Sequence, residues 1–543
     1  MPRLIRPRAA ASLALVGTAV SCLLVASFAP VVAAPVLSLS AGRALDAFEV
    51  EKRLGVELLD APQPDSQPVR FFGQQLDLRV LDGPARRFPL EQVQQLTGAA
   101  GTVQATQVRL DLPQAHIQAL RPLPDADNLR WVIELDRPAF YEVIPTETGL
   151  RLSVQATPVA PLEGPPGLQL TVGPAQSELV FVAPPGSYPL VSTLAAPARL
   201  VLEWRRSGRF ERVQNWGAGL SYREIRTVWE GLPQRLMVAE FDPTRMRLGL
   251  LRSATNLHEL TALSTLAAAQ GAWAAINGSF FNRNTAEALG ALRATGRWWT
   301  SSVAGLPPRG AVNWQDNLPG FDRLNWSASI RLNDRLFPVA AFNSTVAGNG
   351  FALYTPDWGS TYRGRTGETL ALVRAGRIES VFESASPNQE VPIPADAQLL
   401  VARSEALRAQ VRTLAGATAQ LDIVPSGDGS LLQAGPLLIK DGQIVLDATA
   451  ERFQPDVRAP GVARTVIARR GSQGLLIVAC HDGTAAGLSL EALARLLLQL
   501  GVSDALNLDG GGSSAFYLGS HLRDREAGAF ERAIHNGLGL WPR

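Results

Sequence analysis

The chain contains 543 residues, three to four times the length of a usual domain of about 100 to 200 residues, which excludes a single small module. Its 51 Lys and Arg residues nearly balance 49 Asp and Glu residues, and a net charge of +2 excludes a whole-chain electrostatic field for nucleic acid or an anionic membrane. The hydrophobic fraction of 46% and the charged fraction of 18% are typical of a globular protein and exclude a disordered chain.

Residues 1–34 have the pattern of an export signal. Three arginines precede an apolar run, and a Val-Ala-Ala stretch at 32–34 offers a cleavage site. We therefore expect the protein to be exported and to act in the periplasm or outside the cell. If the segment is not cleaved, its apolar run is long enough to span a bilayer and would anchor the protein in the membrane.

The two cysteines are not expected to pair. Cys22 lies within the predicted signal and would be removed with it, which leaves Cys480 alone. Cys480 ends the apolar run 475–479, so a buried strand thiol is favoured over a nucleophile. The stability of the exported chain then has to come from its hydrophobic core.

Residues 40–205 are predicted to form a β-rich region, because short strand-like runs alternate with Pro and Gly. The pattern of 129–154 recurs in 177–204, which indicates a duplicated β unit. In this strand pattern the region resembles the AMIN-type domains of envelope proteins. The resemblance implies binding to cell-wall or envelope glycan, and the alternative is a β spacer that positions the second domain.

Residues 206–543 are predicted to form a second domain of the α/β (α+β) class, with a mixed β-sheet flanked by helices. Apolar residues at helical spacing predict helices over 257–270 and 489–500. Ser489 is a good N-cap for the second helix, and leucines recur along it at the spacing of a buried face.

The stretch 505–516, Ala-Leu-Asn-Leu-Asp-Gly-Gly-Gly-Ser-Ser-Ala-Phe, is the strongest candidate for chemistry. It reads as a buried strand that ends in the carboxylate of Asp509, followed by three glycines and two hydroxyls. Consecutive amides at such a turn can form a concave anion site, with Asp509 at its edge. A tight glycine turn capped by Asp509 is the alternative, but it does not require polar residues on both sides.

Three other predicted strands carry polar groups. The imidazole of His481 and the carboxylate of Asp482 follow one strand, and either could do acid and base work. An Asp-Gly turn is the alternative at that place. Asn277 ends another strand, and Arg464 places a guanidinium inside an apolar one. Because an unpaired buried charge is costly, Arg464 needs a partner or a ligand.

Together, and in this order along the chain, these motifs resemble those of the phosphodiester glycosidase family. The resemblance covers roughly residues 215–543 and rests on 277–281, Gly435-Pro436 with Asp441-Gly442, 464–465, 481–483 and 507–514. It implies a mixed α/β fold and hydrolysis of the bond between an anomeric carbon and a phosphodiester oxygen. It also implies functional roles for Asn277, Arg464, His481, Asp482, Asp509 and the three glycines.

The leaving group of such a substrate is a phosphate monoester, so stabilising its charge matters more than protonating it. We expect Arg464 and the amides of Gly510, Gly511 and Gly512 to hold the phosphate, with Asn277 and Ser513 also in contact with substrate. Asp509 is the first candidate for nucleophile or base, Asp482 is the second, and His481 would carry protons. Retention and inversion of configuration both stay open.

No cofactor is expected. Asn and Asp oxygens would suit a hard cation such as calcium, but no ligand spacing in the sequence is diagnostic of a metal site. The alternative to an enzyme is a non-catalytic envelope protein that binds glycan or scaffolds other proteins. A protease or nuclease is less favoured, since the sequence has neither a nucleophile-elbow pentapeptide nor a phosphate-loop lysine. The expected partner is a phosphodiester-linked glycan.

Overall fold

The computed structural model describes residues 34–40, 43–81, 83–124, 128–162, 168–253, 256–345, 350–384, 386–481 and 487–543. The predicted export signal up to residue 33, with Cys22, lies outside the described residues, and so does Asp482. His481 is described only as the last backbone residue of a strand. No helix within the described ranges is long and apolar enough to cross a membrane.

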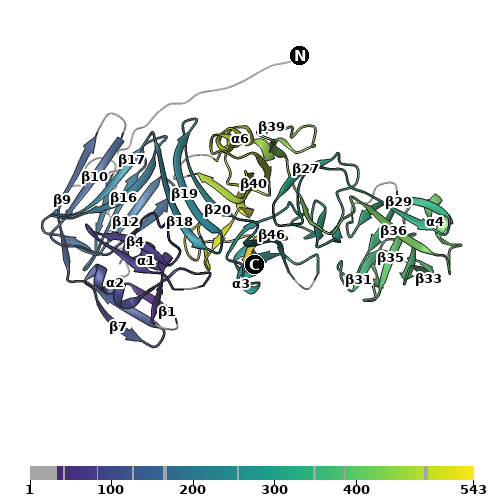
Figure 1. Ribbon diagram of the computed structural model, residues 1–543, viewed down its shortest axis with the longest axis horizontal. Helices are drawn as coiled ribbons and strands as arrows, with labels where there is room; N and C mark the ends of the chain where they lie inside the picture. Colours follow the sequence, from purple (N-terminus) through teal and green to yellow (C-terminus); the bar gives the residue numbers. More distant parts are fainter. Residues whose placement is uncertain are drawn as a thin grey trace, which may run out of the picture.

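The N-terminal part has its own hydrophobic core, whose buried residues run from Leu37 to Trp204. Two short helices, α1 (Ala47–Leu54) and α2 (Leu90–Thr97), accompany two small sheets here (Figure 1). In spatial order the strands of these sheets are β6 (Arg87–Pro89), β2 (Ala44–Asp46), β1 (Val36–Ser40), β8 (Gln107–Asp111) and β7 (Ala100–Gln104), and then β3 (Glu57–Leu58), β4 (Ser66–Phe71) and β5 (Gln74–Arg79).

Two larger sheets of the N-terminal part face each other, as the contact between the rings of Trp131 and Phe181 at 5.4 Å shows. The first has the order β13 (Ala156–Pro158), β9 (Ala115–Pro124), β10 (Asn128–Leu135), β17 (Ala198–Arg205) and β16 (Tyr188–Leu194). The second has the order β11 (Tyr141–Thr146), β12 (Gly149–Val154), β15 (Ser177–Val182) and β14 (Leu168–Val172).

The strand order of these two sheets repeats as a duplicated unit would. The first unit supplies the hairpin β9–β10 to one sheet and β11–β12 to the other. The second unit supplies β14–β15 and β16–β17 with the two sheets exchanged. The inner strands pair across the units, β10 with β17 and β12 with β15, so each sheet is shared between the two units.

Two central sheets enclose the core of the C-terminal part, in which side chains from both sheets are buried together. Neighbouring strands within each sheet are antiparallel. The larger sheet has the order β18 (Arg209–Gly217), β19 (Leu220–Trp229), β20 (Leu232–Phe241), β41 (Gln473–His481), β40 (Arg464–Arg470), β42 (Asp504–Asn507), β38 (Leu437–Lys440) and β39 (Gln443–Ile444). The smaller has the order β21 (Met246–Arg252), β46 (Asn536–Pro542), β23 (Ala274–Asn277), β43 (Phe516–Leu518) and β44 (His521–Leu522).

Helices are a smaller part of this fold than the sequence predicted. Helix α6 (Leu490–Gln499) forms within 489–500, is capped by the Ser489 hydroxyl, and packs its leucines on the outer face of the larger sheet. The other predicted helix shortens to α3 (Leu263–Ala269), because Thr261 and Ala262 pair as β22 with β45 (Ala533–Ile534). The fold is therefore β-rich, and the predicted α/β class is not confirmed.

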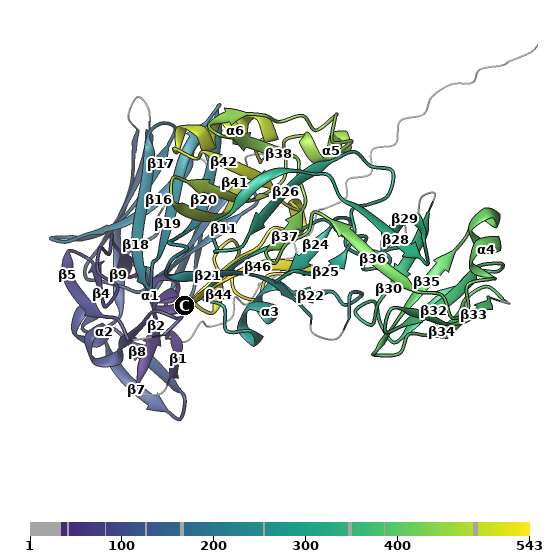
Figure 2. The same ribbon diagram turned by 45° about the vertical axis from the view of Figure 1, so that its right-hand side comes forward.

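A further lobe is inserted between β27 and β37 and lies at the opposite end of the molecule from the N-terminal part (Figure 1, Figure 2). Its seven-stranded sheet has the order β33 (Arg377–Glu383), β32 (Thr369–Arg374), β35 (Ala397–Ala402), β30 (Phe351–Tyr354), β29 (Arg335–Phe342), β28 (Ser327–Leu332) and β36 (Ala419–Val424), accompanied by α4 (Glu405–Val411) and the pair β31 (Thr361–Gly364) and β34 (Gln389–Pro392). The lobe is inserted into a five-stranded sheet, whose first four strands precede the lobe in the chain and whose last strand, β37, follows it. The order of this sheet is β25 (Arg297–Thr300), β24 (Leu292–Ala294), β37 (Ser430–Gln433), β26 (Arg309–Trp314) and β27 (Gly320–Leu324).

A buried ionic cluster joins the N-terminal part to the larger central sheet. The carboxylate of Glu224 accepts from Arg212 and Arg235, each at 2.9 Å, and from Arg226 at 3.2 Å. Arg212 also pairs with Glu51 of α1. Although burial would raise the pKa of Glu224, the three guanidinium groups hold that pKa well below its usual range.

We expect the substitution Glu224→Gln to lower the free energy of unfolding by about 3 kcal/mol, because it leaves buried guanidinium groups without their shared carboxylate. The control is Glu178→Gln, since Glu178 forms a solvent-exposed pair with Arg151 at 3.9 Å and should contribute no more than about 1 kcal/mol. Denaturant unfolding of both variants measures the difference. Equal losses in the two variants would contradict a structural role for the buried cluster.

Candidate active site

The side chain of Asn277 connects the two central sheets at the ends of their strands. Asn277 is the last residue of β23 and is fully buried. Its Nδ2 donates to the carbonyl oxygen of Asp509 at 2.7 Å, and its Oδ1 accepts from the Thr465 hydroxyl at 2.7 Å and the Ala515 amide at 3.1 Å. The Asp509 amide in turn donates to the carbonyl oxygen of Gly278 at 3.0 Å. This geometry gives Asn277 the role of positioning Asp509.

Asp509 follows β42 and is partly exposed. Hydrogen-bond donors from the glycine turn hold its carboxylate. Its Oδ1 accepts from the Gly510 amide at 3.0 Å, and the Ser513 hydroxyl also donates to the carboxylate. Burial raises the pKa of Asp509 above its ordinary value, although these donors and the charges of Arg283 and Arg532 oppose the rise. A carboxyl group with a raised pKa in a polar site is typical of an acid, base or nucleophile.

The three glycines form a tight turn, but most of their amides are already used. The Gly510 amide binds Asp509, and the Gly511 amide donates to the carbonyl oxygen of Ala463 at 2.8 Å. Among the described residues, only the Gly512 amide of the three has no acceptor. Gly511 has a φ of +62°, a conformation that favours glycine. The predicted phosphate cradle of three amides is therefore reduced to one free amide, at Gly512.

The buried guanidinium of Arg464 has its hydrogen-bond partners within the protein. At the start of β40 its guanidinium donates to the carbonyl oxygens of Leu488 at 3.1 Å, Val457 at 2.7 Å and Ala459. Burial lowers the pKa of Arg464 to about 10, and the charge of Glu491 opposes this. Every guanidinium nitrogen of Arg464 thus holds the backbone near the glycine turn, although the sequence predicted a phosphate contact.

Two arginines that the sequence motifs did not indicate carry charges that act on Asp509. Arg283 is exposed and follows the Asn-Gly-Ser-Phe-Phe-Asn stretch, and Arg532 precedes β45. Both are close enough for their charges to lower the pKa of Asp509. Proximity to the Asn277 motif could have indicated Arg283. Nothing in the sequence distinguishes Arg532 from the many other arginines of the chain.

His535 and Asn536 support the site from inside the protein. His535 is 2% exposed, and its Nε2 lies 3.0 Å from the carbonyl oxygen of Leu257, while its Nδ1 lies 2.9 Å from Asn536 Nδ2. Asn536 also accepts from the Ser279 amide through Oδ1 at 2.9 Å. Because the Asn536 amide can donate only to an unprotonated Nδ1, this arrangement requires a neutral imidazole. His535 therefore packs behind the turn that carries Gly278.

The structure gives no side-chain position for the second predicted carboxylate, Asp482, or for His481. Asp482 lies outside the described residues, and the His481 backbone pairs with Gln234 at the end of β41. No three His, Cys, Asp or Glu side chains of the described ranges are grouped so that they could hold a metal ion.

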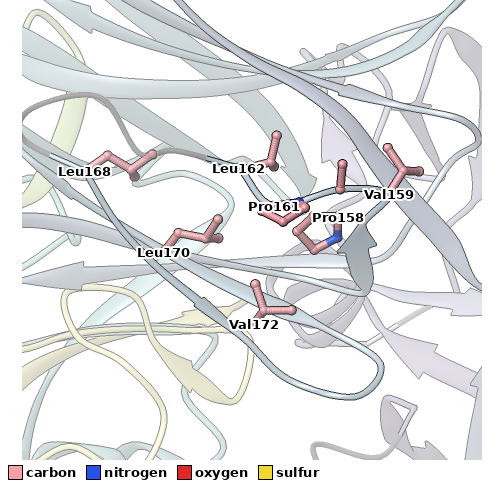
Figure 3. Close-up of a pocket in the computed structure, with 8 residues that line it drawn as sticks. Pro158, Val159, Pro161, Leu162, Leu168, Leu170 and Val172 are labelled. Carbon is pink, nitrogen blue, oxygen red and sulfur yellow. The ribbon is translucent and has the colours of Figure 1, made fainter.

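A cavity of about 570 Å³ lies in the N-terminal part, beside β14 (Figure 3). Leucine, valine, proline and alanine side chains line it, from Pro158 to Leu162 and at Leu168, Leu170 and Val172. None of the described side chains that line it is an acid, a base or a charged group.

Comparison with known proteins finds a family match for part of the chain. Residues 358–541 match the family model of the phosphodiester glycosidases. The match confirms the resemblance found in the sequence motifs. The matched range includes Arg464 and the stretch from Asn507 to Ser514, whereas Asn277 and Arg283 precede it. No curated protein matches the chain with significance.

Solved structures extend the comparison. A hypothetical protein from Synechocystis is 29% identical, has a TM-score of 0.76, and aligns over 92% of this chain and 94% of its own. A Burkholderia pseudomallei protein that is described as exported is 17% identical, with a TM-score of 0.46 over 79% and 97% of the two chains. The catalytic domain of zebrafish N-acetylglucosamine-1-phosphodiester alpha-N-acetylglucosaminidase, auto-inhibited by its pro-peptide, is 12% identical, with a TM-score of 0.29 over 74% and 88%. The first of these shows that nearly the whole fold described above recurs in another protein.

We expect the buried His535 to make stability depend on pH. Burial lowers the pKa of His535 from 6.5 to about 4, so the stability that the neutral ring contributes is present above pH 6.5 and is lost as pH falls toward 4. The loss should reach about 3 kcal/mol, at about 1.4 kcal/mol per pH unit. In His535→Gln this part of the acid destabilisation should disappear. Unfolding measured from pH 7.5 to 4.5 tests this, and identical pH slopes in the two proteins would refute it.

Proposed function

We propose that the protein is an exported hydrolase that cleaves the glycosidic bond of a sugar-1-phosphodiester in envelope or extracellular glycan. The observation that carries the proposal is the partly buried Asp509, whose pKa is raised and whose backbone is fixed by Asn277, within the range matched to the phosphodiester glycosidases. A protein that only binds or scaffolds glycan has no need for a carboxylate tuned in this way, which favours the enzyme over the non-catalytic alternative.

In the proposed reaction the bond between the anomeric carbon and the bridging oxygen breaks, and the phosphate monoester leaves with the electron pair. Asp509 acts in its ionised form. It either attacks the anomeric carbon, forming a glycosyl ester that water later hydrolyses, or takes a proton from the water that attacks. The products are a free sugar and a phosphate monoester. Asp482 is proposed as the second carboxylate, and His481 as the proton carrier.

The raised pKa of Asp509 suits this role. A carboxylate whose pKa lies nearer to the working pH is a stronger base than an ordinary aspartate, provided that it is still ionised. Burial supplies the rise, and the donors from Ser513 and Gly510 limit it. The site thus combines a carboxylate made more basic by burial with donors that favour its ionised form.

The N-terminal part has a different role in the proposal. Its duplicated β unit would bind cell-wall or envelope glycan and hold the catalytic part near its substrate. The two parts are firmly joined through the cluster around Arg212, Glu51 and Glu224, which supports their acting as one body.

The products identify the reaction. We expect incubation with a panel of sugar-1-phosphodiesters to release free sugar and a phosphate monoester, because the carbon–oxygen bond is the one that breaks. Chromatography with a phosphate assay separates these products from a sugar phosphate and an alcohol. Release of the sugar phosphate would mean cleavage of the phosphorus–oxygen bond and would overturn the glycosidase proposal.

Asp509→Asn should fold normally and lose turnover by about three orders of magnitude or more. The amide keeps an oxygen for the Gly510 hydrogen bond but can neither attack nor accept a proton. Because the folded pKa of Asp509 is raised, its carboxyl contributes stability only at low pH, so the variant should be at least as stable as the wild type at pH 7. Turnover near the wild-type rate would exclude Asp509 as the catalytic carboxylate.

Ser513→Ala should move the acid limb of the kcat/KM profile to higher pH. The Ser513 hydroxyl is one of the donors that lower the pKa of Asp509, so its loss raises that pKa further. Ser329→Ala, on a strand of the inserted lobe, serves as the matched control. An acid limb that stays in place in Ser513→Ala would show that Asp509 is not the group titrating in the profile.

A further inference from the structure

We propose that Arg532 and the free amide of Gly512 form the subsite that holds the phosphate of the substrate, with Arg283 as a further positive charge that acts on the site. The inference deepens the proposed function and rests on it, because it assigns the anionic half of the substrate to named groups. It replaces Arg464 and the amides of Gly510 and Gly511, which are already bound within the protein.

The guanidinium of Arg532 lies directly against the glycine turn. A Cβ atom on Gly512 would meet Arg532 Nη2 at 2.5 Å, Cζ at 2.7 Å and Nη1 at 2.9 Å. These three similar distances mean that the flat face of the guanidinium covers Gly512, and only glycine allows this approach. The one free amide of the turn and the guanidinium of Arg532 are therefore neighbours.

Among the described residues, no carboxylate neutralises the charge of Arg532. Within the described part of the chain, neither Arg532 nor Arg283 has a carboxylate at ion-pair distance. The contrast with Arg525 on the same loop is informative, because Arg525 pairs with Asp524 at 2.6 Å. Two unpaired guanidinium groups beside one partly buried carboxylate leave a local positive excess, which a phosphodiester can satisfy with charge-assisted hydrogen bonds.

The loop that carries Arg532 is fixed at both ends. Arg525 donates to the carbonyl oxygens of Ser514 and, at 2.8 Å, of Phe530, so it ties the loop to the glycine turn. Glu531 accepts from the amide of Ser264, at the start of α3, at 2.9 Å. These contacts hold the Arg532 backbone on its N-terminal side, and the pairing of Ala533 with Ala262 holds it on the other side, so its position is built into the fold.

Arg532 is also linked to Asp509. Its Nη1 lies 3.4 Å from Ser513 Oγ, and the Ser513 hydroxyl donates to the Asp509 carboxylate. The anion subsite and the catalytic carboxylate are thus one hydroxyl apart. When the glycosidic bond breaks, charge collects on the departing phosphate beside Arg532, where it is stabilised, while Asp509 faces the anomeric carbon.

The test compares Arg532→Gln and Arg283→Gln with Arg464→Gln and with the control Arg495→Gln, which removes a charge from an exposed pair on α6. We expect Arg532→Gln to lower kcat/KM for a sugar-1-phosphodiester by about ten- to a hundredfold. For an aryl glycoside of the same sugar, which has no phosphate, the change should stay within about threefold. Arg283→Gln should show the same selective loss, and Arg495→Gln no loss with either substrate.

Binding of inorganic phosphate gives a readout that does not depend on turnover. Titration calorimetry should show phosphate binding in the wild type and in Arg495→Gln. In Arg532→Gln the affinity for phosphate should be lower by about tenfold or more. Gly512→Ala should have the same effect, because the added methyl group displaces the guanidinium. Circular dichroism confirms that each variant is folded before it is compared.

The outcomes separate the inference from the proposed function. If no phosphodiester is hydrolysed but phosphate binding still depends on Arg532, the proposed function fails and the anion subsite stands. If folded Arg532→Gln and Gly512→Ala bind phosphate as the wild type does, the inference is overturned. A selective loss in folded Arg464→Gln with none in Arg532→Gln would also overturn it and return the phosphate to Arg464.

Discussion

The structure around Asp509 depends on one requirement, that the donor and the acceptor of the buried Asn277 amide must both be paired where the two central sheets meet. Asn277 meets it by binding the backbone of one strand end and accepting from Thr465 and Ala515 of two others. An aspartate could not replace it, since both a donor and an acceptor are needed. The hydrogen bonds that offset the cost of burying the Asn277 amide also fix the backbone of Asp509, whose side chain is partly exposed.

The parts of the fold that follow from local patterns could be predicted from the sequence. The helix after Ser489, the buried strand before Asp509 and the turn at the three glycines are encoded within a few residues, and the structure contains all three. The strand pattern that recurs in the N-terminal part is local in the same way, and the strand order is compatible with the duplication that it predicts. The length of α3 was not, because Thr261 and Ala262 pair with residues more than 250 positions later in the chain.

The partners of buried polar groups could not be predicted, because many of them are backbone carbonyls, which every residue type carries. The sequence shows that Arg464 needs a partner, but not that backbone carbonyls on either side of residues 482–486 supply it. It shows three glycine amides, but not that Asp509 and Ala463 use two of them. Arg532 carries no local signal, and only the three-dimensional structure shows that its guanidinium lies against Gly512. Residue types and their order suggest a class of chemistry. Which arginines are bound within the protein can be seen only in the three-dimensional structure.

The exchange of hairpins in the N-terminal part has a consequence for how that part is divided. One unit taken alone would consist of two hairpins in separate sheets, each with its inner strand, β10 or β12, lacking its neighbour. The unpaired backbone N–H and C=O groups of a strand edge tend to pair with another strand, and a second copy of the unit would pair with both β10 and β12. Two half-length chains related by a twofold axis would build the same pair of sheets. The region thus has the topology of a strand-exchanged homodimer that has been joined into a single polypeptide.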